Sequence, residues 1–192
     1  MVATGNRHKV EEIRAMLADL PLAVRSLAEF PGVPEVVENG ATYRENALKK
    51  AWSAAKFTGK PALADDTGLE VDALGGQPGL YAARFAGEGC SFQDNVRKLL
   101  HLLDGVPSER RGARFVCVIA LVFPDGREQV VEGELCGRIS ESQSGGGGFG
   151  YDPVFFVPEA GKTLAELTAD EKNRVSHRRR ALDRARTIIL AN

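Results

Sequence analysis

Residues 114–123, RFVCVIALVF, contain the longest apolar run of the chain. Apolar side chains fill both alternating faces of this run, which predicts a central strand covered on both sides. The run is only about half as long as a membrane-spanning helix requires. The sequence Pro124-Asp125-Gly126 then predicts a turn into a second strand over residues 128–140. Together these segments predict a long antiparallel hairpin within a sheet.

Helical and extended segments alternate before the hairpin. A brief strand at residues 1–3 and another at 23–26 are expected to enclose a helix with one apolar face, formed by Val10, Ile13, Leu17 and Leu20. After a loop over residues 30–40, Thr42 and Glu45 form a T-x-x-E capping box that begins a second helix, and Gly59 ends it. The buried stripe of this second helix is predicted to be Ala47, Leu48, Ala51, Trp52 and Ala55.

The remaining segments continue this alternation. Residues 61–71, PALADDTGLEV, predict a short strand, a turn carrying two carboxylates, and a second strand. A third amphipathic helix is expected over residues 92–103, and a short strand over 151–156. Thr168 and Glu171 form a second capping box, which opens one or two helices reaching residue 190. We therefore expect an α/β fold with an elongated mixed sheet flanked by helices.

The composition is that of a globular protein. Of the 192 residues, 43% are hydrophobic and 27% are charged, which excludes a disordered chain. Lys and Arg total 25 against 26 for Asp and Glu, giving a net charge of -1. This balance argues against a protein dedicated to nucleic acid or to a membrane surface. We expect a single domain over residues 1–192.

The cysteines and the first residues of the chain indicate in which cell compartment the protein is expected. Cys90, Cys117 and Cys136 lie far apart without a C-x-x-C pair, so they predict neither a disulfide framework nor a zinc site. Each is expected to be a small buried residue. The chain begins with MVATGNRHK and shows no apolar stretch long enough for a signal peptide. We expect a cytoplasmic protein.

The first candidate site is residues 4–9, at a predicted strand-to-helix junction. Backbone amides and the helix dipole at such a junction favour a bound anion, and Gly5 allows close approach of the backbone. Asn6 would add a donor and Lys9 a positive charge. The alternative is a helix cap with a solvated lysine, and the segment alone does not decide between them.

The second candidate site is Asp65-Asp66-Thr67. Neighbouring side chains of a strand point to opposite faces, so only one of the two aspartates can face a given pocket. A carboxylate at the end of a strand suits a Mg²⁺ ligand or a general base, with the Thr67 hydroxyl as a partner. The alternative is an Asx-type turn in which the carboxylates bond nearby backbone.

A third group of candidates consists of Glu35, Glu38 and Glu45. Glu38 lies in a predicted loop without an evident structural task, so a role as a metal ligand fits it. Glu45 already has a task in the capping box. We therefore expect Glu38 rather than Glu45 to hold a metal.

The fourth candidate site is the glycine-rich segment 145–153, GGGGFGYDP. Such a loop can fold closely over a flat ligand, and Phe149 can stack on a base, whereas the alternative is a flexible hairpin connection. Downstream, a cationic patch is either a phosphate and base contact or a solvated helix face; it comprises Lys172, Arg174, Arg178, Arg179 and Arg180. His177 taken alone is more often structural than a ligand.

Five segments occur in one order along the chain: ATGNRHK, ENGATYRENALKKA, ALADDTGLEVDALGGQPGLYAARF, GGGGFGYDPVF and ELTADEKNRVSHRRRAL. Together they closely resemble the inosine/xanthosine triphosphate pyrophosphatase family, which clears non-canonical purine nucleotides. The resemblance covers nearly the whole chain. It implies two lobes with a nucleotide cleft between them, usually a homodimer, and Mg²⁺-dependent hydrolysis of a nucleoside triphosphate to the monophosphate and pyrophosphate.

The resemblance also implies roles for individual residues. Glu38 and Asp66 match the family's magnesium ligands, and Asp66 also matches its proton acceptor. Thr67 stands at a substrate-contacting position that is commonly serine, a departure that keeps the hydroxyl, and a second departure is the shortened first strand. The other matched substrate contacts are Thr4, Gly5, Asn6, Arg7, His8, Lys9, Phe149, Gly150, Tyr151, Asp152, Lys172, His177 and Arg178.

These implied roles are chemically consistent. Mg²⁺, Lys9 and Lys172 would screen the charge of a triphosphate. Asp66, with Asp65 as a candidate for sharing its duties, would orient a water and accept its proton. The sequence suggests no Ser–His or Cys–His pair, so we expect direct hydrolysis without a covalent intermediate.

The expected substrates are ITP, dITP and XTP. Donors from Arg178 or from backbone amides would match the 6-oxo group of these purines and be left unpaired by adenine. We expect a small nucleotide as the binding partner, and neither nucleic acid nor a membrane. The rival interpretations are a pyrophosphatase for pyrimidine or modified nucleotides, and a non-catalytic nucleotide sensor or RNA-binding module.

Overall fold

The computed structural model describes residues 1–191, and the chain divides into two compact units built from interleaved segments. The first unit consists of Met1–Asp66, Cys117–Gly133 and Arg178–Asn192. The second consists of Thr67–Val116 and Glu134–His177. The expectation of a single domain over residues 1–192 is not decided by this division and stays a prediction.

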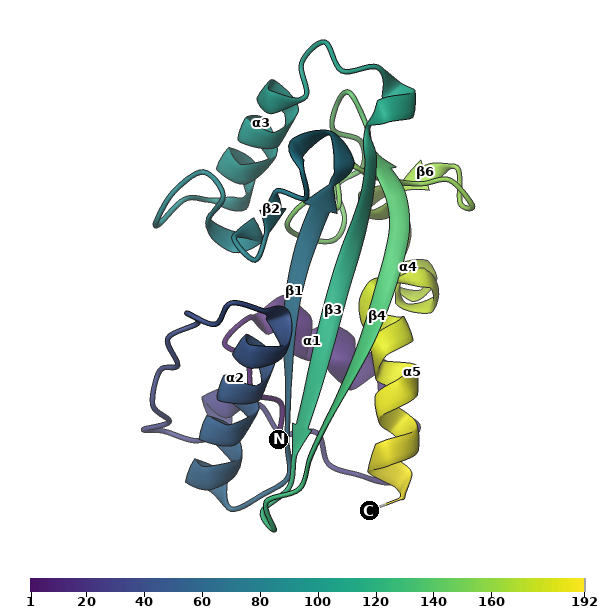
Figure 1. Cartoon of the computed structure of the whole chain (residues 1–192). Coiled ribbons are helices and arrows are strands. Elements are labelled where there is room, and N and C mark those ends of the chain that lie inside the picture. Colours follow the sequence, from purple (N-terminus) through teal and green to yellow (C-terminus); the bar gives the residue numbers. More distant parts are fainter. Residues whose placement is uncertain (192) are drawn as a thin grey trace. The chain divides into compact units, whose positions relative to one another are not determined.

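A six-stranded sheet with the order β2-β1-β3-β4-β5-β6 runs through the described residues (Figure 1). Its strands are β1 (Ala62–Val71), β2 (Pro78–Gly79), β3 (Gly112–Val122), β4 (Glu128–Ile139), β5 (Phe155–Val157) and β6 (Lys162–Thr163). β2 pairs antiparallel with β1, β5 with β4, and β6 with β5. Parallel neighbours occur at Val2, which forms single bridges with Ser26 and Leu63.

The helices of residues 1–191 begin and end close to the predicted residues. They are α1 (Arg7–Met16), α2 (Tyr43–Thr58), α3 (Phe92–Leu102), α4 (Ala169–Val175) and α5 (His177–Leu190). Short 3₁₀ turns cover Leu27–Glu29, Asp72–Leu74, Ala82–Arg84, Ser108–Arg110 and Leu164–Glu166. Helices and strands alternate along the chain, so the predicted α/β class is confirmed. No helix among the described residues is long and apolar enough to span a membrane.

The predicted helix signals act as expected. Thr42 caps α2 by accepting a hydrogen bond from the Glu45 amide at 3.1 Å, and Gly59 ends the helix with a φ of 64°. The Glu45 carboxylate accepts from the Ala41 amide at 2.8 Å. The capping box of Thr168 and Glu171 is complete at the start of α4.

Each unit has its own hydrophobic core. In the first unit, α1 and α5 contribute Ile13 and Leu182 to a cluster that also contains Ile119 of β3. In the second unit, Leu99 of α3 belongs to a cluster with Leu69 and Phe155. The apolar run of residues 115–123 is buried throughout, which confirms a strand covered on both faces.

Several local predictions were wrong. The expected strands at residues 1–3 and 23–26 are reduced to isolated bridges, and the strand expected over 151–156 covers only Phe155–Val157. Residues 62–71 form one continuous strand, so no turn interrupts it at the two aspartates. Strand hydrogen bonding therefore prevailed over the local turn preference of aspartate.

Burial also differs from prediction at a few side chains. All three cysteines are free, but only Cys117 is buried; Cys90 is half-buried and Cys136 is exposed. Cys136 follows the buried Leu135 on β4, so the alternation of the strand turns its side chain outward. On α2, Leu48 and Trp52 are partly exposed.

Candidate functional site

The two neighbouring carboxylates of β1 face different partners within the first unit. Asp65 contacts Lys9 of α1 and Arg178 of α5, and Asp66 contacts Asn46 and Lys50 of α2. Figure 1 shows α2 in front of β1 and α1 behind it. The predicted alternation of the two side chains is therefore confirmed, and it places them in separate environments.

Asp65 is the centre of a buried ion-pair network. Its Oδ2 atom lies 3.0 Å from Lys9 Nζ and accepts hydrogen bonds from Arg178 Nη2 at 3.0 Å and Nε at 3.2 Å. Arg178 Nη1 also donates to Glu12 of α1. Burial alone raises the pKa of Asp65, but Lys9 and Arg178 outweigh it and hold that pKa well below the ordinary value. Asp65 is therefore expected to be ionised at neutral pH and to anchor Lys9 and Arg178.

Asp66 is held more weakly and has the opposite pKa shift. Its Oδ2 atom accepts a hydrogen bond from Asn46 Nδ2 at 3.2 Å, and its Oδ1 atom lies 3.3 Å from Lys50 Nζ. Burial raises the pKa of Asp66, and the neighbouring Glu38 raises it further, against the lowering effect of Lys50 and Lys9. A carboxylate with a raised pKa is a better proton acceptor than an ordinary aspartate.

Glu38 and Asp66 reach a common cation. Lys50 Nζ donates to Glu38 Oε2 at 2.7 Å while it contacts Asp66, so the loop carboxylate is bound beside the strand carboxylate. Carboxylate oxygens suit Mg²⁺, which is usually held by one or two carboxylates plus substrate phosphates. Among residues 1–191 no group of three or more His, Cys, Asp or Glu is placed to hold a metal. The two carboxylates could hold a divalent ion only with further ligands from outside the chain, and this role stays a prediction.

Several of residues 4–9 have partners within the chain, and their contact with substrate stays a prediction. The Asn6 side chain caps α1 by accepting from the amides of His8 at 3.0 Å and Lys9 at 3.3 Å. These two amides are therefore already bonded, and the helix-cap alternative is correct for Asn6. Arg7 pairs with Glu11 along the exposed surface of the helix. Lys9 is the member that reaches the carboxylates, although its side chain is not solvated as that alternative assumed.

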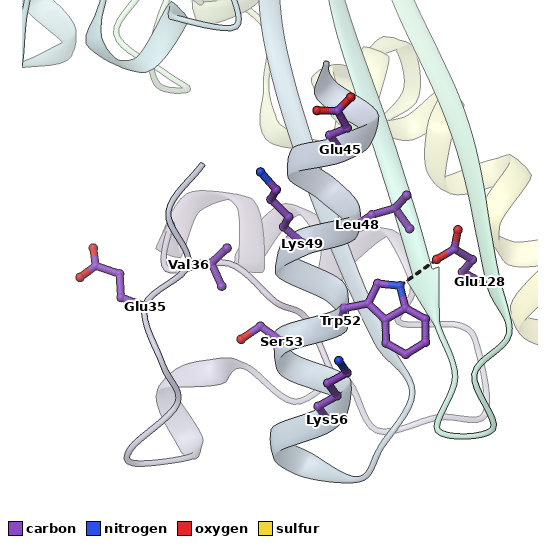
Figure 2. A pocket seen from close by; sticks show the side chains of 9 residues that line it. All are labelled: Glu35, Val36, Glu45, Leu48, Lys49, Trp52, Ser53, Lys56 and Glu128. Atoms are coloured by element: carbon purple, nitrogen blue, oxygen red, sulfur yellow. Dashed lines mark hydrogen bonds between the residues drawn. The ribbon is translucent and has the colours of Figure 1, made fainter. Parts of the chain in front are cut away.

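A hollow of about 640 Å³ in the first unit is lined by two of the three candidate glutamates (Figure 2). Glu35 and Glu45 line it, together with Trp52, whose Nε1 atom donates to Glu128 at 2.7 Å. Neither Glu38 nor Asp66 is part of its lining. Glu38 instead shares the Lys50 cation with Asp66, and the preference for Glu38 over Glu45 as a metal ligand stays a prediction.

The second unit contains a separate cluster around Phe149. Asp152 Oδ2 accepts from the Phe149 amide at 2.7 Å and from Lys172 Nζ at 2.6 Å, and both Asp152 and Lys172 are buried. The Lys172 ammonium lies 4.5 Å from the centroid of the Phe149 ring, a cation–π contact. Phe149 itself is partly exposed. Asp152 and Lys172 thus hold an aromatic ring at the surface of a glycine-rich loop.

The other predicted contacts of the second unit differ in exposure. Tyr151 is buried and donates its hydroxyl to the Ala82 carbonyl at 2.8 Å. His177 is buried and its ring stacks on Phe115 at a centroid distance of 4.6 Å. Gly150 and Thr67 are partly exposed. The geometry of Tyr151 and His177 supports a structural role, and their contact with substrate stays a prediction.

Gly148→Ala should destabilise the Phe149 loop. Gly148 has a φ of 69°, where a side chain costs about 1–2 kcal/mol. A Cβ atom there would lie 2.1 Å from Asp152 Oδ2, the atom that bonds both Phe149 and Lys172. We expect the free energy of unfolding, measured with urea, to fall by at least about 1 kcal/mol. Gly146→Ala is the control, because open space surrounds that position; equal stability of the two variants would contradict the prediction.

Arg178 is the residue whose surroundings differ most from expectation. Its side chain is only 1% exposed, and its three nitrogens donate to Asp65 and Glu12. In this arrangement it neutralises Asp65, and its predicted contact with a purine base stays a prediction. The network also requires Glu12, which the sequence interpretation did not single out.

Two further residues of the carboxylate site were missed. Asn46 and Lys50 lie four residues apart and therefore share one face of α2. Asn46 is 4% exposed and bonds both Asp66 and the Gly40 amide. The sequence did contain a signal for them: Asn46 and Lys50 stand at helical spacing in line with the buried Ala54. The predicted buried stripe rested instead on the apolar residues of this helix.

Comparison with known proteins identifies the family. The Ham1 family model matches residues 1–188. A dITP/XTP pyrophosphatase of Geobacter sulfurreducens is 56% identical over 182 residues, which are 95% of this chain and 92% of that protein. The structure of a HAM1 protein from Coxiella burnetii matches with a TM-score of 0.89 and 39% identity, covering 100% of this chain and 98% of the other.

A solved structure also has the same activity in its name as the Geobacter sulfurreducens relative. The crystal structure of a nucleoside-triphosphatase / dITP/XTP pyrophosphatase from Mycobacterium abscessus matches with a TM-score of 0.76 and 44% identity, covering 96% of each chain. The resemblance inferred from the five ordered segments is thereby confirmed. This chain belongs to the Ham1 family.

Proposed function

We propose that this chain hydrolyses ITP, dITP and XTP to the corresponding monophosphate and pyrophosphate in a Mg²⁺-dependent reaction. The observation that carries the proposal is the convergence of Asp66 and Glu38 on a common cation, the Lys50 ammonium. The names of the Geobacter sulfurreducens and Mycobacterium abscessus relatives support the same substrate class.

Glu38 and Asp66 would hold the metal ion. When bound, Mg²⁺ supplies positive charge that polarises the phosphoryl oxygens. Two ammonium groups, Lys9 and Lys50, already lie beside the aspartates and add positive charge where a polyphosphate would bind. The carboxylates and ammonium groups together supply the charges that phosphoryl transfer requires.

Asp66 would accept the proton of the attacking water. The Asn46 amide fixes the orientation of its Oδ2 atom, which would help the carboxylate to meet the water. The water oxygen forms a bond to phosphorus, the phosphoanhydride bond breaks, and pyrophosphate leaves. The reaction needs no covalent intermediate with the chain.

Phe149 would provide a stacking surface for the purine base. The buried Asp152–Lys172 pair fixes the loop that presents this ring, and the partly exposed aromatic suits a flat heterocycle. Phe149→Ala is the corresponding test within the second unit. It should raise KM for dITP more than it lowers kcat.

Selectivity for 6-oxo purines is the direct test of the proposed function. Purified protein with Mg²⁺ and dITP or XTP should release the monophosphate and pyrophosphate, with ATP slower by about 10⁴-fold because its 6-amino group leaves a site donor unpaired. Ion-exchange chromatography of the products gives the ratio of kcat/KM values. Equal turnover of ATP would refute the selectivity.

Two rival functions give different results in the same assay. A pyrimidine-directed pyrophosphatase would prefer dTTP or UTP. A non-catalytic nucleotide sensor or RNA-binding module would bind without turnover, with an affinity that falls steeply with salt. The carboxylate pair disfavours the sensor, because a site that only binds anions gains nothing from two carboxylates without a metal.

A homodimer in the cytoplasm, where nucleotide precursors are consumed, completes the proposal. Light scattering coupled to size-exclusion chromatography should then give twice the chain mass of 20.7 kDa. A mass equal to one chain at micromolar concentration would contradict the dimer without bearing on the hydrolysis.

A further inference from the structure

Lys50 lies where the proposed metal ligands converge. Its Nζ atom is 2.7 Å from Glu38 Oε2 and 3.3 Å from Asp66 Oδ1, and its side chain is 11% exposed. The ammonium therefore bridges a loop carboxylate and a strand carboxylate within the first unit. This is the arrangement a divalent ion would need from the same two oxygens.

The Lys50 ammonium is held by its contacts with the two carboxylates. Lys50 thus places a positive charge between Glu38 and Asp66. Its flexible four-carbon stem allows the charge to move without any change in the helix.

We propose that Lys50 is a placeholder cation: its ammonium occupies the Glu38–Asp66 pair in the metal-free chain, and a divalent ion binds the pair only by displacing it. The inference rests on the proposed function, because it takes the pair as the metal ligands. Mg²⁺ binds oxygens at about 2.1 Å, so an ion held by these two oxygens would lie close to the Lys50 ammonium, and the like charges would repel each other. Even after displacement, Lys50 remains near the ion and repels it.

Lys50 has two opposing effects on metal binding, and the structure decides which is larger. Its ammonium holds Glu38 in place, which favours metal binding. It also competes with the metal for both carboxylates, which weakens metal binding. The loop is also anchored without Lys50: the Gly40 amide donates to Asn46 at 2.8 Å, and Lys49 Nζ donates to Asn39 at 2.7 Å. Without Lys50, the two residues that follow Glu38 thus remain anchored to α2, and we expect competition to be the larger effect.

The test is titration of the full chain with Mn²⁺ alone, without nucleotide, followed by the electron paramagnetic resonance signal of the free ion. Lys50→Met should lower the Kd for Mn²⁺ at least about tenfold, because a repelling charge is lost. Damage to the fold would raise the Kd instead, so the sign separates the two causes. Lys56→Met is the matched control: it removes the same charge from α2, but its ammonium lies over Trp52.

Two further variants make the result decisive. Glu38→Gln added to Lys50→Met should abolish the gain in affinity, because the divalent ion loses a ligand. Lys50→Gln replaces Lys50→Met if circular dichroism shows that the latter is unfolded. A Kd equal to or above that of the wild type in a folded Lys50 variant, or a gain that survives Glu38→Gln, would overturn the placeholder.

The two proposals fail separately. If the wild-type chain hydrolyses dITP but the Lys50 variants bind Mn²⁺ no more tightly, only the placeholder is wrong. If the Lys50 variants bind Mn²⁺ more tightly but the wild type hydrolyses no nucleotide, the proposed function is wrong and the ion competition stands.

Discussion

Asp66→Asn is expected to lower kcat for dITP at least about a hundredfold, because the variant loses both the proton acceptor and one metal ligand. The asparagine keeps the shape of the side chain and can still accept the hydrogen bond from Asn46. Lys50 keeps Glu38 as a partner. The loss is therefore confined to the chemistry that a negative charge supplies.

The stability of this variant should not fall with its activity. The pKa of Asp66 is raised in the folded chain, chiefly by burial, so folding disfavours its ionised form. A carboxyl with a raised pKa binds protons more tightly when folded, and its contribution to stability decreases as the pH rises through that range. A neutral asparagine removes this cost at pH 7.

Steady-state kinetics and urea unfolding of the same preparation check both halves of the prediction. Activity within tenfold of the wild type would remove Asp66 from the proposed mechanism. A large loss of stability together with a loss of activity would show that the side chain acts through the fold.

The fold was predictable where the pattern was long or the end signals were strong. The apolar run of residues 115–123 and the caps at Thr42 and Thr168 gave correct elements because many local interactions agree there. The prediction of a strand at residues 1–3 was wrong because the pairing there depends on distant residues: Val2 pairs with Ser26 and Leu63. Such long-range pairing leaves little trace in a short segment.

The site was predictable in its carboxylates but not in its cations. Alternation along β1 correctly separated Asp65 from Asp66, because it follows from backbone geometry alone. Which cation meets which carboxylate depends on how α1, α2 and α5 pack. The resemblance implied that Arg178 contacts the substrate. The sequence could not show that its guanidinium is also buried between Asp65 and Glu12.

Asp65→Asn should cause a large loss of stability, in contrast to Asp66→Asn, which is expected to lose activity but not stability. Asp65 is fully buried, and its charge is balanced by Lys9 and Arg178. Removing one partner from a buried ion-pair network leaves positive charge in a dry environment, which typically costs about 3–5 kcal/mol. Urea unfolding at pH 7 should show this loss with an unchanged m-value, and Asp66→Asn is the matched control.

The pH dependence identifies the cause of that loss. The pKa of Asp65 is lowered in the folded chain, since Lys9 and Arg178 outweigh burial, so its stabilising contribution is complete above the ordinary aspartate pKa of about 3.9. Below that pH the contribution decreases by about 1.4 kcal/mol per pH unit, because the unfolded chain takes up a proton that the folded chain refuses. The wild type and Asp65→Asn should thus converge in stability from pH 4 towards pH 3, by about 1 kcal/mol. If their difference stays constant over that range, the lost charge of Asp65 is not what destabilises the variant, and packing at this position of β1 is.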